Sequence, residues 1–510
     1  MALLTAGTFV TVRTAILFFP LIPMIALVLT LAVKYLLHRD VSLPMIALSS
    51  ILQIATGVFL ILTFYGSSGV HVEPVSQWDY SIVFAFDSTR SYFVAALLIP
   101  MLFSFQRLRT LPTFSSRVIF LFYLTGCSGL VVVGDLFSFF VLYELMIMAA
   151  YMLIAVKEQY YASIKYMLFG AVSSAFFLGG IVLLYASGAY FNFAFVETVA
   201  DLSVYNLKIV MILFSTAFFV KAALFPASSW IATCHSATNG LVSSFLSSFT
   251  VFTGLFGLNY LVIQPAISLG YEPIFTFLRG ISLISIAASA IFLFLETDFK
   301  RCIAGSTAYS IAIVGVLLSY REVNLAMSYI VVHACYKSLF FLLAENTERD
   351  GMQLRGSLLG ALTFAALILF AGGLFPTLTH FVKSEVPAIG IRYKLVTYAS
   401  LFFALSAFLK FRYRVIKVPP PRVLIASAAG VMVLLYLTFS HYPSGFSPLL
   451  VTIEAGILVA ALILARPLFS AVQRFANLDS RFVFYNLNVE LLYVILLFLA
   501  QTAILRFVLE

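Results

Sequence analysis

Long apolar runs alternate with short polar segments along the whole chain of 510 residues. A helix needs about 20 consecutive, mostly apolar residues to cross the hydrocarbon core of a bilayer. The pattern therefore predicts an all-α polytopic membrane protein with about 14 to 16 transmembrane helices. The sixteen expected spans are 15–37, 43–65, 88–106, 118–134, 136–156, 163–186, 208–230, 240–263, 273–295, 300–319, 323–345, 356–383, 391–412, 422–440, 447–465 and 488–508.

The basic residues between these spans gather on one side of the predicted membrane. When the loops are assigned alternately to the two sides, nineteen of the thirty Lys and Arg fall on one side and eight on the other. Because cytoplasmic loops carry the excess of Lys and Arg, the first side is assigned to the cytoplasm. We therefore expect a multi-pass protein of the cell membrane with both termini outside. The remaining three, Lys221, Lys337 and Lys383, lie inside predicted spans.

The composition agrees with a membrane protein and narrows its chemistry. Hydrophobic residues make up 62% of the chain and charged residues 10%, and the mean hydropathy is +1.07. The net charge of +9 follows the cytoplasmic bias, so the expected partner is the lipid bilayer and not a nucleic acid. The four cysteines stand singly, without the spacing of a metal or iron–sulfur site, and no Gly-rich phosphate loop follows a strand. We expect no metal, cofactor or redox centre held by this chain alone.

The predicted span 208–230 combines two features that cost stability in lipid. Lys221 places an ammonium group inside the span, and Pro226 interrupts the helix. A broken helix is tolerated in a membrane where neighbouring helices or water satisfy the freed backbone groups, so an internal polar cavity is expected here. Glu144, at the centre of span 136–156, is the expected partner of Lys221 at the same depth. The alternative for these two residues is a static buried ion pair.

Two histidines add candidates to this polar interior. His333 and Lys337 are four residues apart, hence on one face of span 323–345, and we expect them to handle protons near mid-membrane. His235 follows the break at Pro226 and is predicted near the cytoplasmic end, where a solvated or packed histidine competes with a relay.

A second interruption is expected in span 356–383. The triplet Leu-Phe-Pro occurs at 224–226 and again at 374–376, where His380, Lys383 and Glu385 follow it. The two interrupted spans are five apart in order and so cross the membrane in opposite directions. Broken helices in matching positions of inverted units mark transport pathways. We therefore expect two inverted five-helix repeats, 118–263 and 273–412, between N-terminal helices in 1–117 and C-terminal helices in 422–510.

The outward loop from Gly66 to Arg90 holds Glu73, Trp78, Asp79 and Asp87. An alternating stretch near Tyr80 to Phe86 predicts a short hairpin. A cap over the outer face is the expected role of this loop.

Six segments together resemble the antiporter-like membrane subunits of respiratory complex I, of Mrp-type cation/proton antiporters and of membrane-bound hydrogenases. The resemblance covers about residues 90–410 and implies a fourteen-helix core with two inverted five-helix repeats, to which two C-terminal spans are added. The segments are LYELMIMAAYMLI (142–154), KYMLFGAVSSAFFLGGIVLLYASG (165–188), FVKAALFPASSW (219–230), DFKRCIAGSTAYSIAIVG (298–315), HACYKSLFFLLA (333–344) and GGLFPTLTHFVKSE (372–385).

The resemblance also implies roles for individual residues. Glu144 and Lys221 would modulate proton loading, and His333 and Lys337 would be connecting relay groups. In the second broken helix the family has a lysine or glutamate just after Phe-x-Ser or Phe-x-Gly, whereas Lys383 comes one residue early and Ser384 and Glu385 follow. Lys383 is favoured for this position. Glu385 and His235 are secondary candidates.

The span 240–263 departs from the family pattern. Relatives carry a lysine or histidine there as the central proton station, whereas residues 250–253 of this chain are Thr-Val-Phe-Thr. Relatives also have an acidic, proline-rich turn after the tryptophan, where this chain has IATCHSATNGLV. Protons can cross such a gap through water and hydroxyls, for which the candidates are Ser247, Ser248, Thr250 and Thr253.

The resulting hypothesis is an ion-translocating subunit of a multisubunit redox-driven complex, moving protons or exchanging Na⁺ for protons. The divergent turn favours the hydrogenase or sulfur-reductase branch, with the redox centres in other membrane and peripheral subunits. Two alternatives stay open: a structural subunit that has lost conduction, and a subunit of an Mrp-type cation/proton antiporter.

Overall fold

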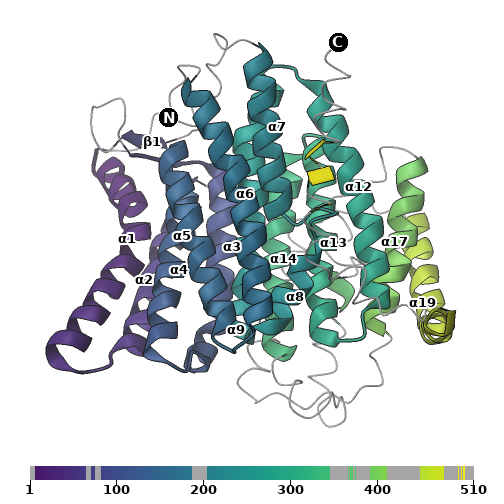
Figure 1. Ribbon diagram of the computed structural model, residues 1–510, viewed down its shortest axis with the longest axis horizontal. Coiled ribbons are helices and arrows are strands. Elements are labelled where there is room, and N and C mark those ends of the chain that lie inside the picture. The colour runs from purple at the N-terminus through teal and green to yellow at the C-terminus, as the bar shows by residue number, and fades with distance from the viewer. Residues whose placement is uncertain are drawn as a thin grey trace. The chain divides into compact units, whose positions relative to one another are not determined.

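The computed structural model describes residues 6–64, 71–74, 82–186, 204–344, 391–409 and 448–475, with isolated positions 366, 368–371, 374, 492, 495, 496, 498 and 499. Helices make up most of this part of the chain (Figure 1). Nine of them, among the described residues, are long and apolar enough to cross a membrane, which confirms the predicted multi-pass helical protein. The expected spans 356–383, 422–440 and 488–508 lie largely outside the described residues. The total of 14 to 16 helices and the inverted repeats stay predictions.

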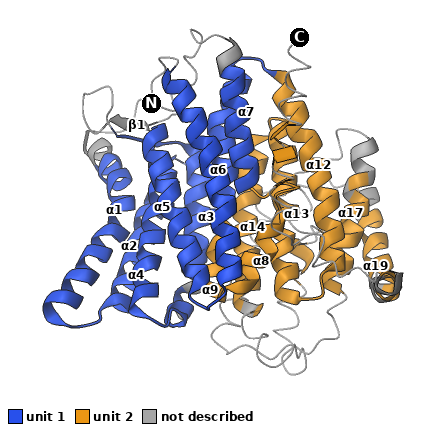
Figure 2. Cartoon of the chain, in the orientation of Figure 1, with its two compact units in different colours: residues 1–221, 249–271 blue, residues 222–248, 272–510 orange. Residues whose placement is uncertain are grey.

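The chain forms two compact units (Figure 2). Unit 1 comprises Met1–Lys221 and Phe249–Tyr271, and unit 2 comprises Ala222–Ser248 and Glu272–Glu510. The first boundary follows Lys221 directly. The second lies within the span that begins at Gly240. The four segments expected from the repeats, 1–117, 118–263, 273–412 and 422–510, stay a separate prediction.

Unit 1 contains seven long helices of the described chain and a two-stranded sheet. Helix α4 packs against α1 and α5, while α6 packs between α5 and α7. The elements are α1 (Ala6–Leu37), α2 (Ser42–Phe64), β1 (His71–Pro74), β2 (Val83–Phe86), α3 (Ser88–Ser104), the 3₁₀ helix η1 (Phe105–Thr110), α4 (Phe114–Val132), α5 (Leu136–Ala155), α6 (Tyr160–Ala186) and α7 (Val204–Lys221).

Unit 2 is organised around α13. This helix packs against α8, α12 and α14, and α12 and α19 both pack against α17. Residues on nearly all sides of α13 are buried, so it is a core helix of the unit. The helices are α8 (Ser229–Ala237), α9 (Gly240–Phe245), α12 (Glu272–Leu295), α13 (Phe299–Ser319), α14 (Val323–Ala344), α17 (Ile391–Leu409) and α19 (Pro448–Phe475).

A single transmembrane helix runs from Gly240 to Ser268. All residues in its most apolar stretch of 18 are buried. Two π-helical turns divide it into α9, η3 (Leu246–Thr250), α10 (Phe252–Leu258), η4 (Asn259–Ile263) and α11 (Gln264–Ser268). A π-turn widens the helix locally and leaves a backbone group without its regular i−4 partner, and such turns recur at functional sites.

Acidic and amide side chains define where several helices begin. Asp87, Asp135, Asn239 and Asp298 each stand just before a helix and accept a hydrogen bond from the backbone N–H three residues ahead. These caps satisfy helix-end donors that would otherwise be unpaired, with about 1 kcal/mol at stake for each. The short polar segments between apolar runs therefore place the helix ends.

The outer loop and the C-terminal region test two further expectations. Strands β1 and β2 pair antiparallel, with His71 opposite Phe86, which confirms the hairpin predicted near Tyr80 to Phe86. The span expected over 447–465 ends too early, because α19 continues for ten more residues to Phe475. Pro467 lies inside this helix, where a single proline is accommodated without ending it.

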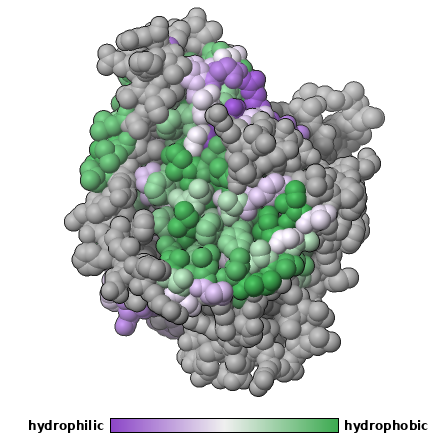
Figure 3. Space-filling model, turned by 90° about the vertical axis from the view of Figure 1, so that its right-hand side faces the viewer, coloured by the Kyte–Doolittle hydropathy of each residue, from purple (hydrophilic) through white to green (hydrophobic). Residues whose placement is uncertain are grey.

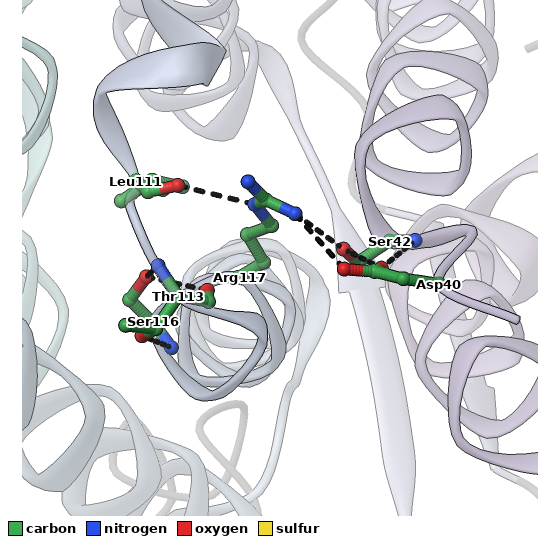
Figure 4. A network of polar contacts seen from close by, with 6 residues as sticks. All are labelled: Asp40, Ser42, Leu111, Thr113, Ser116 and Arg117. Atoms are coloured by element: carbon green, nitrogen blue, oxygen red, sulfur yellow. Dashed lines mark hydrogen bonds and ion pairs between the residues drawn. The ribbon is translucent and has the colours of Figure 1, made fainter. Parts of the chain in front are cut away.

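A polar network joins the turn between α1 and α2 to the start of α4 (Figure 4). Arg117 donates to Asp40 Oδ2 at 3.1 Å and to the Leu111 carbonyl at 3.1 Å. Asp40 also accepts bonds from the Ser42 backbone N–H and hydroxyl. Thr113 and Ser116 cap each other reciprocally at the start of α4. This network fixes the expected cytoplasmic ends of three helices.

Apolar side chains cover the outward faces of the helices. Leu48, Ile51 and Leu62 of α2, and Ile463 of α19, are among the large exposed hydrophobics. The face drawn in Figure 3 is mainly hydrophobic over the middle of its described part, with the most hydrophilic residues near the top and at the lower left. A surface of this kind is stable against lipid tails, in agreement with the membrane assignment.

Candidate functional site

The helix that carries Lys221 is broken, as expected. Helix α7 ends at Lys221 and α8 begins at Ser229, so residues 222–228 interrupt the predicted span. The Phe225 N–H donates to Ser285 Oγ on α12 at 2.8 Å, and the Ala227 N–H donates to the Leu224 carbonyl at 2.8 Å. A neighbouring helix therefore satisfies a backbone group freed by the break, as the low-dielectric interior requires.

Lys221 is buried at the C-terminal end of α7, with 3% of its surface exposed. Its Nζ donates to the phenol oxygen of Tyr166 at 2.9 Å and lies 4.9 Å and 5.4 Å from the ring centroids of Tyr166 and Tyr143. The C-terminal end of a helix and the faces of aromatic rings both favour a cation. Unit 1 therefore offers an ammonium group a phenol, two ring faces and a helix dipole.

Glu144 lies on α5 directly after Tyr143 and is half-buried. Its Oε1 atom has no hydrogen-bond partner among the described residues. Lys221 therefore does not donate a hydrogen bond to this oxygen. Tyr143 shares a 2.6 Å hydrogen bond with Ser173, whose hydroxyl donates to the Ala217 carbonyl at 2.8 Å. This Tyr143–Ser173 link holds α5, α6 and α7 together beside Lys221. The relay role of Glu144 stays a prediction.

His333 and Lys337 are both fully buried in α14. Lys337 Nζ donates to the Ile303 carbonyl and to Ser306 Oγ, both on α13. His333 Nδ1 is 2.9 Å from the phenol oxygen of Tyr336, which is 2.9 Å from Ser310 Oγ. Lys337 therefore faces α13, and His333 is linked to α13 through Tyr336.

The hydroxyls expected to cover the gap in span 240–263 divide into two pairs. In unit 2, Ser247 is 2.8 Å from Thr307 Oγ1, and Ser248 is 2.9 Å from Ser338 Oγ. In unit 1, Thr250 bonds the phenol of Tyr123, and Thr253 donates to the Thr250 carbonyl at 2.6 Å. Three of the four lie in the π-helical turn η3. Unit 2 therefore has a hydroxyl network close to Lys337, which directly precedes Ser338 in α14.

His235 is packed and not solvated, since its exposed fraction is 0%. Its ring lies 6.1 Å from the Trp230 ring and 6.0 Å from the Phe341 ring. The backbone carbonyl of His235 accepts a hydrogen bond from Ser243 Oγ at 2.6 Å. The histidine therefore lies at the turn between α8 and α9, and its relay role stays a prediction.

Lys300 is a buried cation that the alternation of spans and loops places in a cytoplasmic loop. It lies in the first turn of α13, with 4% of its surface exposed, and its Nζ donates to the Thr238 carbonyl at the end of α8. Thr238 Oγ1 is 2.5 Å from Ser243 Oγ. The sequence does not distinguish Lys300 from other basic residues at the ends of spans, because Asp298 precedes it closely and Arg301 follows it directly.

Three predicted candidates lie outside the described residues: Lys383, Glu385 and His380. Of the second Leu-Phe-Pro triplet only Leu374 is described, and its N–H donates to the Leu369 carbonyl at 3.0 Å. Within the described part of the chain, no group of three or more His, Cys, Asp or Glu is placed to hold a metal ion.

These features define a class of protein: a polytopic membrane protein with a helix broken beside one buried lysine and a second buried lysine in a hydroxyl-rich interior. The chain matches the family described as NADH:quinone oxidoreductase/Mrp antiporter, TM, over residues 133–409. The protein belongs to this family, as the sequence resemblance predicted.

Similar sequences come from both branches of the family. The chain is 30% identical over 232 residues to an Na(+)/H(+) antiporter subunit of Bacillus subtilis (strain 168), covering 42% of this chain and 45% of that protein. It is 24% identical over 321 residues to an Na(+)/H(+) antiporter subunit of Alkalihalophilus pseudofirmus, covering 58% and 63%. It is 26% identical over 282 residues to NAD(P)H-quinone oxidoreductase chain 4-3 of Nostoc sp., covering 52% and 50%. The matches therefore span less than two thirds of each of these relatives.

Two solved structures share the fold. The membrane-bound sulfane sulfur reductase, an archaeal respiratory membrane complex, contains a chain that matches with a TM-score of 0.74 at 18% identity, covering 88% of this chain and 99% of that one. The Mrp complex from Dietzia sp. contains a chain that matches with a TM-score of 0.76 at 16% identity, covering 92% and 57%. At these identities the likeness concerns the fold alone.

Proposed function

We propose that this chain translocates protons across the cell membrane as one subunit of a multisubunit complex. The relay consists of Glu144, Lys221, His333, Lys337 and Lys383, with His235 and Glu385 as secondary members. In this proposal the two termini face outward, and other membrane and peripheral subunits supply the driving reaction.

The observation that carries the proposal is the setting of Lys337. A lysine in the middle of a membrane helix costs a few kcal/mol and is typical of ion pathways. Lys337 is fully buried in α14, and its described hydrogen bonds go to neutral oxygens of Ile303 and Ser306. Neutral acceptors stabilise an ammonium less than a carboxylate does, so the group can lose and regain its proton at moderate cost.

Hydroxyls around Lys337 supply the neighbouring steps. Tyr336, the residue before Lys337, is joined to His333 by a 2.9 Å hydrogen bond. Ser338, the residue after Lys337, lies 2.9 Å from Ser248. A hydroxyl donates and accepts at once, so it can pass a proton on without a net change of charge. These groups, with water, replace in unit 2 the ionisable residue that is missing from the span after Gly240.

The parent complex in this proposal is a redox-driven one of the sulfur-reductase or hydrogenase type. The support is the divergent turn after Trp230 and the shared fold with a chain of the sulfane sulfur reductase over 99% of that chain. The alternative is an Mrp-type complex that exchanges Na⁺ for protons, which the similarity to the two Na(+)/H(+) antiporter sequences favours. Purification of the chain with its neighbours distinguishes them, because only the redox-driven complex carries redox centres in its soluble subunits.

Proton uptake into inverted membrane vesicles that contain the intact complex tests the relay. Lys221→Met and Glu144→Gln remove the charges and nearly keep the side-chain volumes, and each is expected to lower the uptake rate by about tenfold, which corresponds to about 1.4 kcal/mol of barrier. Lys157→Met and Glu158→Gln are the matched controls, because both residues are exposed in the turn between α5 and α6. Full uptake in both interior variants, at normal levels of assembled complex, would leave the non-conducting structural subunit as the function.

A further inference from the structure

One end of unit 1 carries a buried polar cluster that the proposed relay does not use. The β-hairpin meets the loop before α5 there, since the Gly134 N–H donates to the Val83 carbonyl at 2.7 Å. The Val83 N–H donates to Asp135 Oδ2 at 3.0 Å. Arg90 of α3 is 1% exposed and donates to the carbonyls of Val131 and Val133 at 2.6 Å and 2.7 Å. The positive-inside pattern places this hairpin end on the outer side.

Asp87 is the titratable group of this cluster that reaches the surface. Its side chain is 13% exposed, and both carboxylate oxygens lie 2.7 Å from the phenol oxygen of Tyr260. Arg90 lies 3.7 Å from the same carboxylate and stacks on the Tyr260 ring at 4.9 Å. A phenol directed at a carboxylate beside a guanidinium group can exchange its proton with the carboxylate over one short hydrogen bond.

Asn259, the residue before Tyr260, is fully buried, and neither atom of its side-chain amide has a hydrogen-bond partner among the described residues. An amide buried without partners costs about 1–3 kcal/mol or more. The residue opens the π-helical turn η4, which breaks the regular helix at this position. The amide offers an acceptor oxygen and an NH₂ group with two donors. Water is a small molecule that can both donate to the oxygen and accept from the NH₂ group.

We propose that Asn259 binds water inside unit 1 and that this water, Tyr260 and Asp87 form the outward proton-release port of the protein. This inference rests on the proposed proton translocation. A proton reaching the Asn259 water passes to the Tyr260 oxygen while the phenol gives its own proton to Asp87. The carboxylic acid then loses that proton to the outer solution. Tyr260 and Asp87 return to their starting states, so no charge or atom is left over.

Thiol labelling tests the water site without reference to transport. Asn259→Cys is made in the full complex and treated with a charged, membrane-impermeant methanethiosulfonate from the hairpin side. Leu258→Cys is the matched control, since Leu258 is the neighbouring residue and is also fully buried. The four native cysteines are buried and provide the background in the unmodified protein. Asn259→Cys is expected to react at least about tenfold faster than Leu258→Cys, because the reacting thiolate forms only where water reaches the thiol. Equal rates, or reaction only from the opposite side, would overturn the port.

Transport by conservative variants tests the acid and the phenol. Asp87→Asn keeps an N-cap for α3, because asparagine caps as well as aspartate does. Its matched control is Asp298→Asn, another helix-capping aspartate, which is exposed at the start of α13. Asp87→Asn and Tyr260→Phe are expected to lower proton uptake by about fivefold or more at normal assembly, whereas Asp298→Asn leaves it unchanged.

The same assay separates the failure of this port from the failure of the proposed function. Unchanged uptake in Asp87→Asn and Tyr260→Phe, with uptake lost in Lys337→Met, would refute the port and leave the relay standing. Uptake that survives Lys337→Met as well would refute proton translocation by this chain. The labelling result stands in either case, because it reports water at Asn259 and not conduction.

Discussion

The two units bury a lysine in different ways, and the difference indicates how each can handle a proton. In unit 1, Lys221 ends a helix and meets a phenol and two ring faces. In unit 2, Lys337 lies within a continuous helix and bonds a carbonyl and a hydroxyl of the neighbouring helix. The first setting stabilises the cation through the helix end, two ring faces and one hydrogen bond, and the second mainly through two direct hydrogen bonds, with one ring centroid, that of Tyr336, 5.9 Å away.

This contrast explains why only one of the two helices is broken at its lysine. A helix end supplies a partial negative charge that a helix interior lacks, and its stabilisation of a cation is typically about 0.3–1 kcal/mol. Lys221 of unit 1 therefore lies where its helix ends, whereas Lys337 of unit 2 lies among hydroxyls of α13 and α14. We expect Lys337 to depend more strongly on single hydrogen bonds than Lys221 does.

The largest effect is expected from Lys337→Met. Methionine fills the same space and cannot carry a proton, so proton uptake by the intact complex should fall by more than about tenfold, equivalent to over 1.4 kcal/mol. Uptake into inverted vesicles measures this loss. Lys157→Met, in an exposed turn, is the control for the loss of a lysine as such. A variant that keeps most of its uptake would remove the proposed difference between the two units.

A smaller effect is expected from the double variant Ser247→Ala/Ser248→Ala. It removes two hydroxyls that bond Thr307 and Ser338, while the π-helical turn keeps its backbone. The change weakens the proton path but leaves Lys337 in place, so uptake should fall by about three- to tenfold, equivalent to about 0.7–1.4 kcal/mol of barrier. Ser319→Ala is the matched control, because this buried hydroxyl donates only to the Val316 carbonyl in its own helix among its described bonds. Equal uptake in the double variant and the control would show that these hydroxyls carry no protons.

Tyr166→Phe sharpens the comparison from the side of unit 1. The change removes the phenol that accepts from Lys221 and keeps the ring 4.9 Å from Nζ. Because the helix end and the rings persist, uptake should fall by only about two- to threefold, near the low end of what a lost hydrogen bond costs. Ser306→Ala makes the equivalent change beside Lys337 and should lower uptake more. A larger loss in Tyr166→Phe than in Ser306→Ala, measured in the same vesicles, would reverse the proposed order.

The smallest effect is expected at Asp40, outside both relay regions. Two hydrogen bonds from Ser42 lower the pKa of this carboxyl, and the charges of Arg117 and Lys34 lower it further. A carboxyl with a lowered pKa in the folded state stabilises the protein above its unfolded pKa of about 3.9, and this contribution disappears as pH falls through the folded value. Asp40→Asn should therefore be slightly less stable than the parent near pH 6, and the difference should shrink as the pH falls below the unfolded pKa and through the lowered pKa of the folded state. Thermal unfolding of the detergent-solubilised complex at several pH values measures it, and a difference that grows on acidification would contradict the assignment.

The sequence was sufficient to predict a multi-pass helical membrane protein and the break after Lys221. Apolar runs of the required length, a proline and an intramembrane lysine are local signals that need no knowledge of neighbours. The spacing of His333 and Lys337 likewise places both on one helical face. The family membership followed from short motifs in the same stretches.

The partners of these side chains could not be predicted from the sequence. Lys221 donates a hydrogen bond to Tyr166, 55 positions away along the chain, and no local signal in the sequence singled out that phenol. Lys300 looked like a loop residue and is buried, and Asp87 looked like part of a cap and bonds Tyr260. Each of these contacts joins separate helices.

By itself, then, the order of residues determined that this protein is a bundle of lipid-spanning helices and where charge enters it, because bilayer thickness and helix geometry act on consecutive residues. Only the tertiary structure decided which oxygen meets each charge and which hydroxyls face one another. Those choices depend on how helices far apart in the chain pack, and packing selects among many oxygens that are equivalent in sequence.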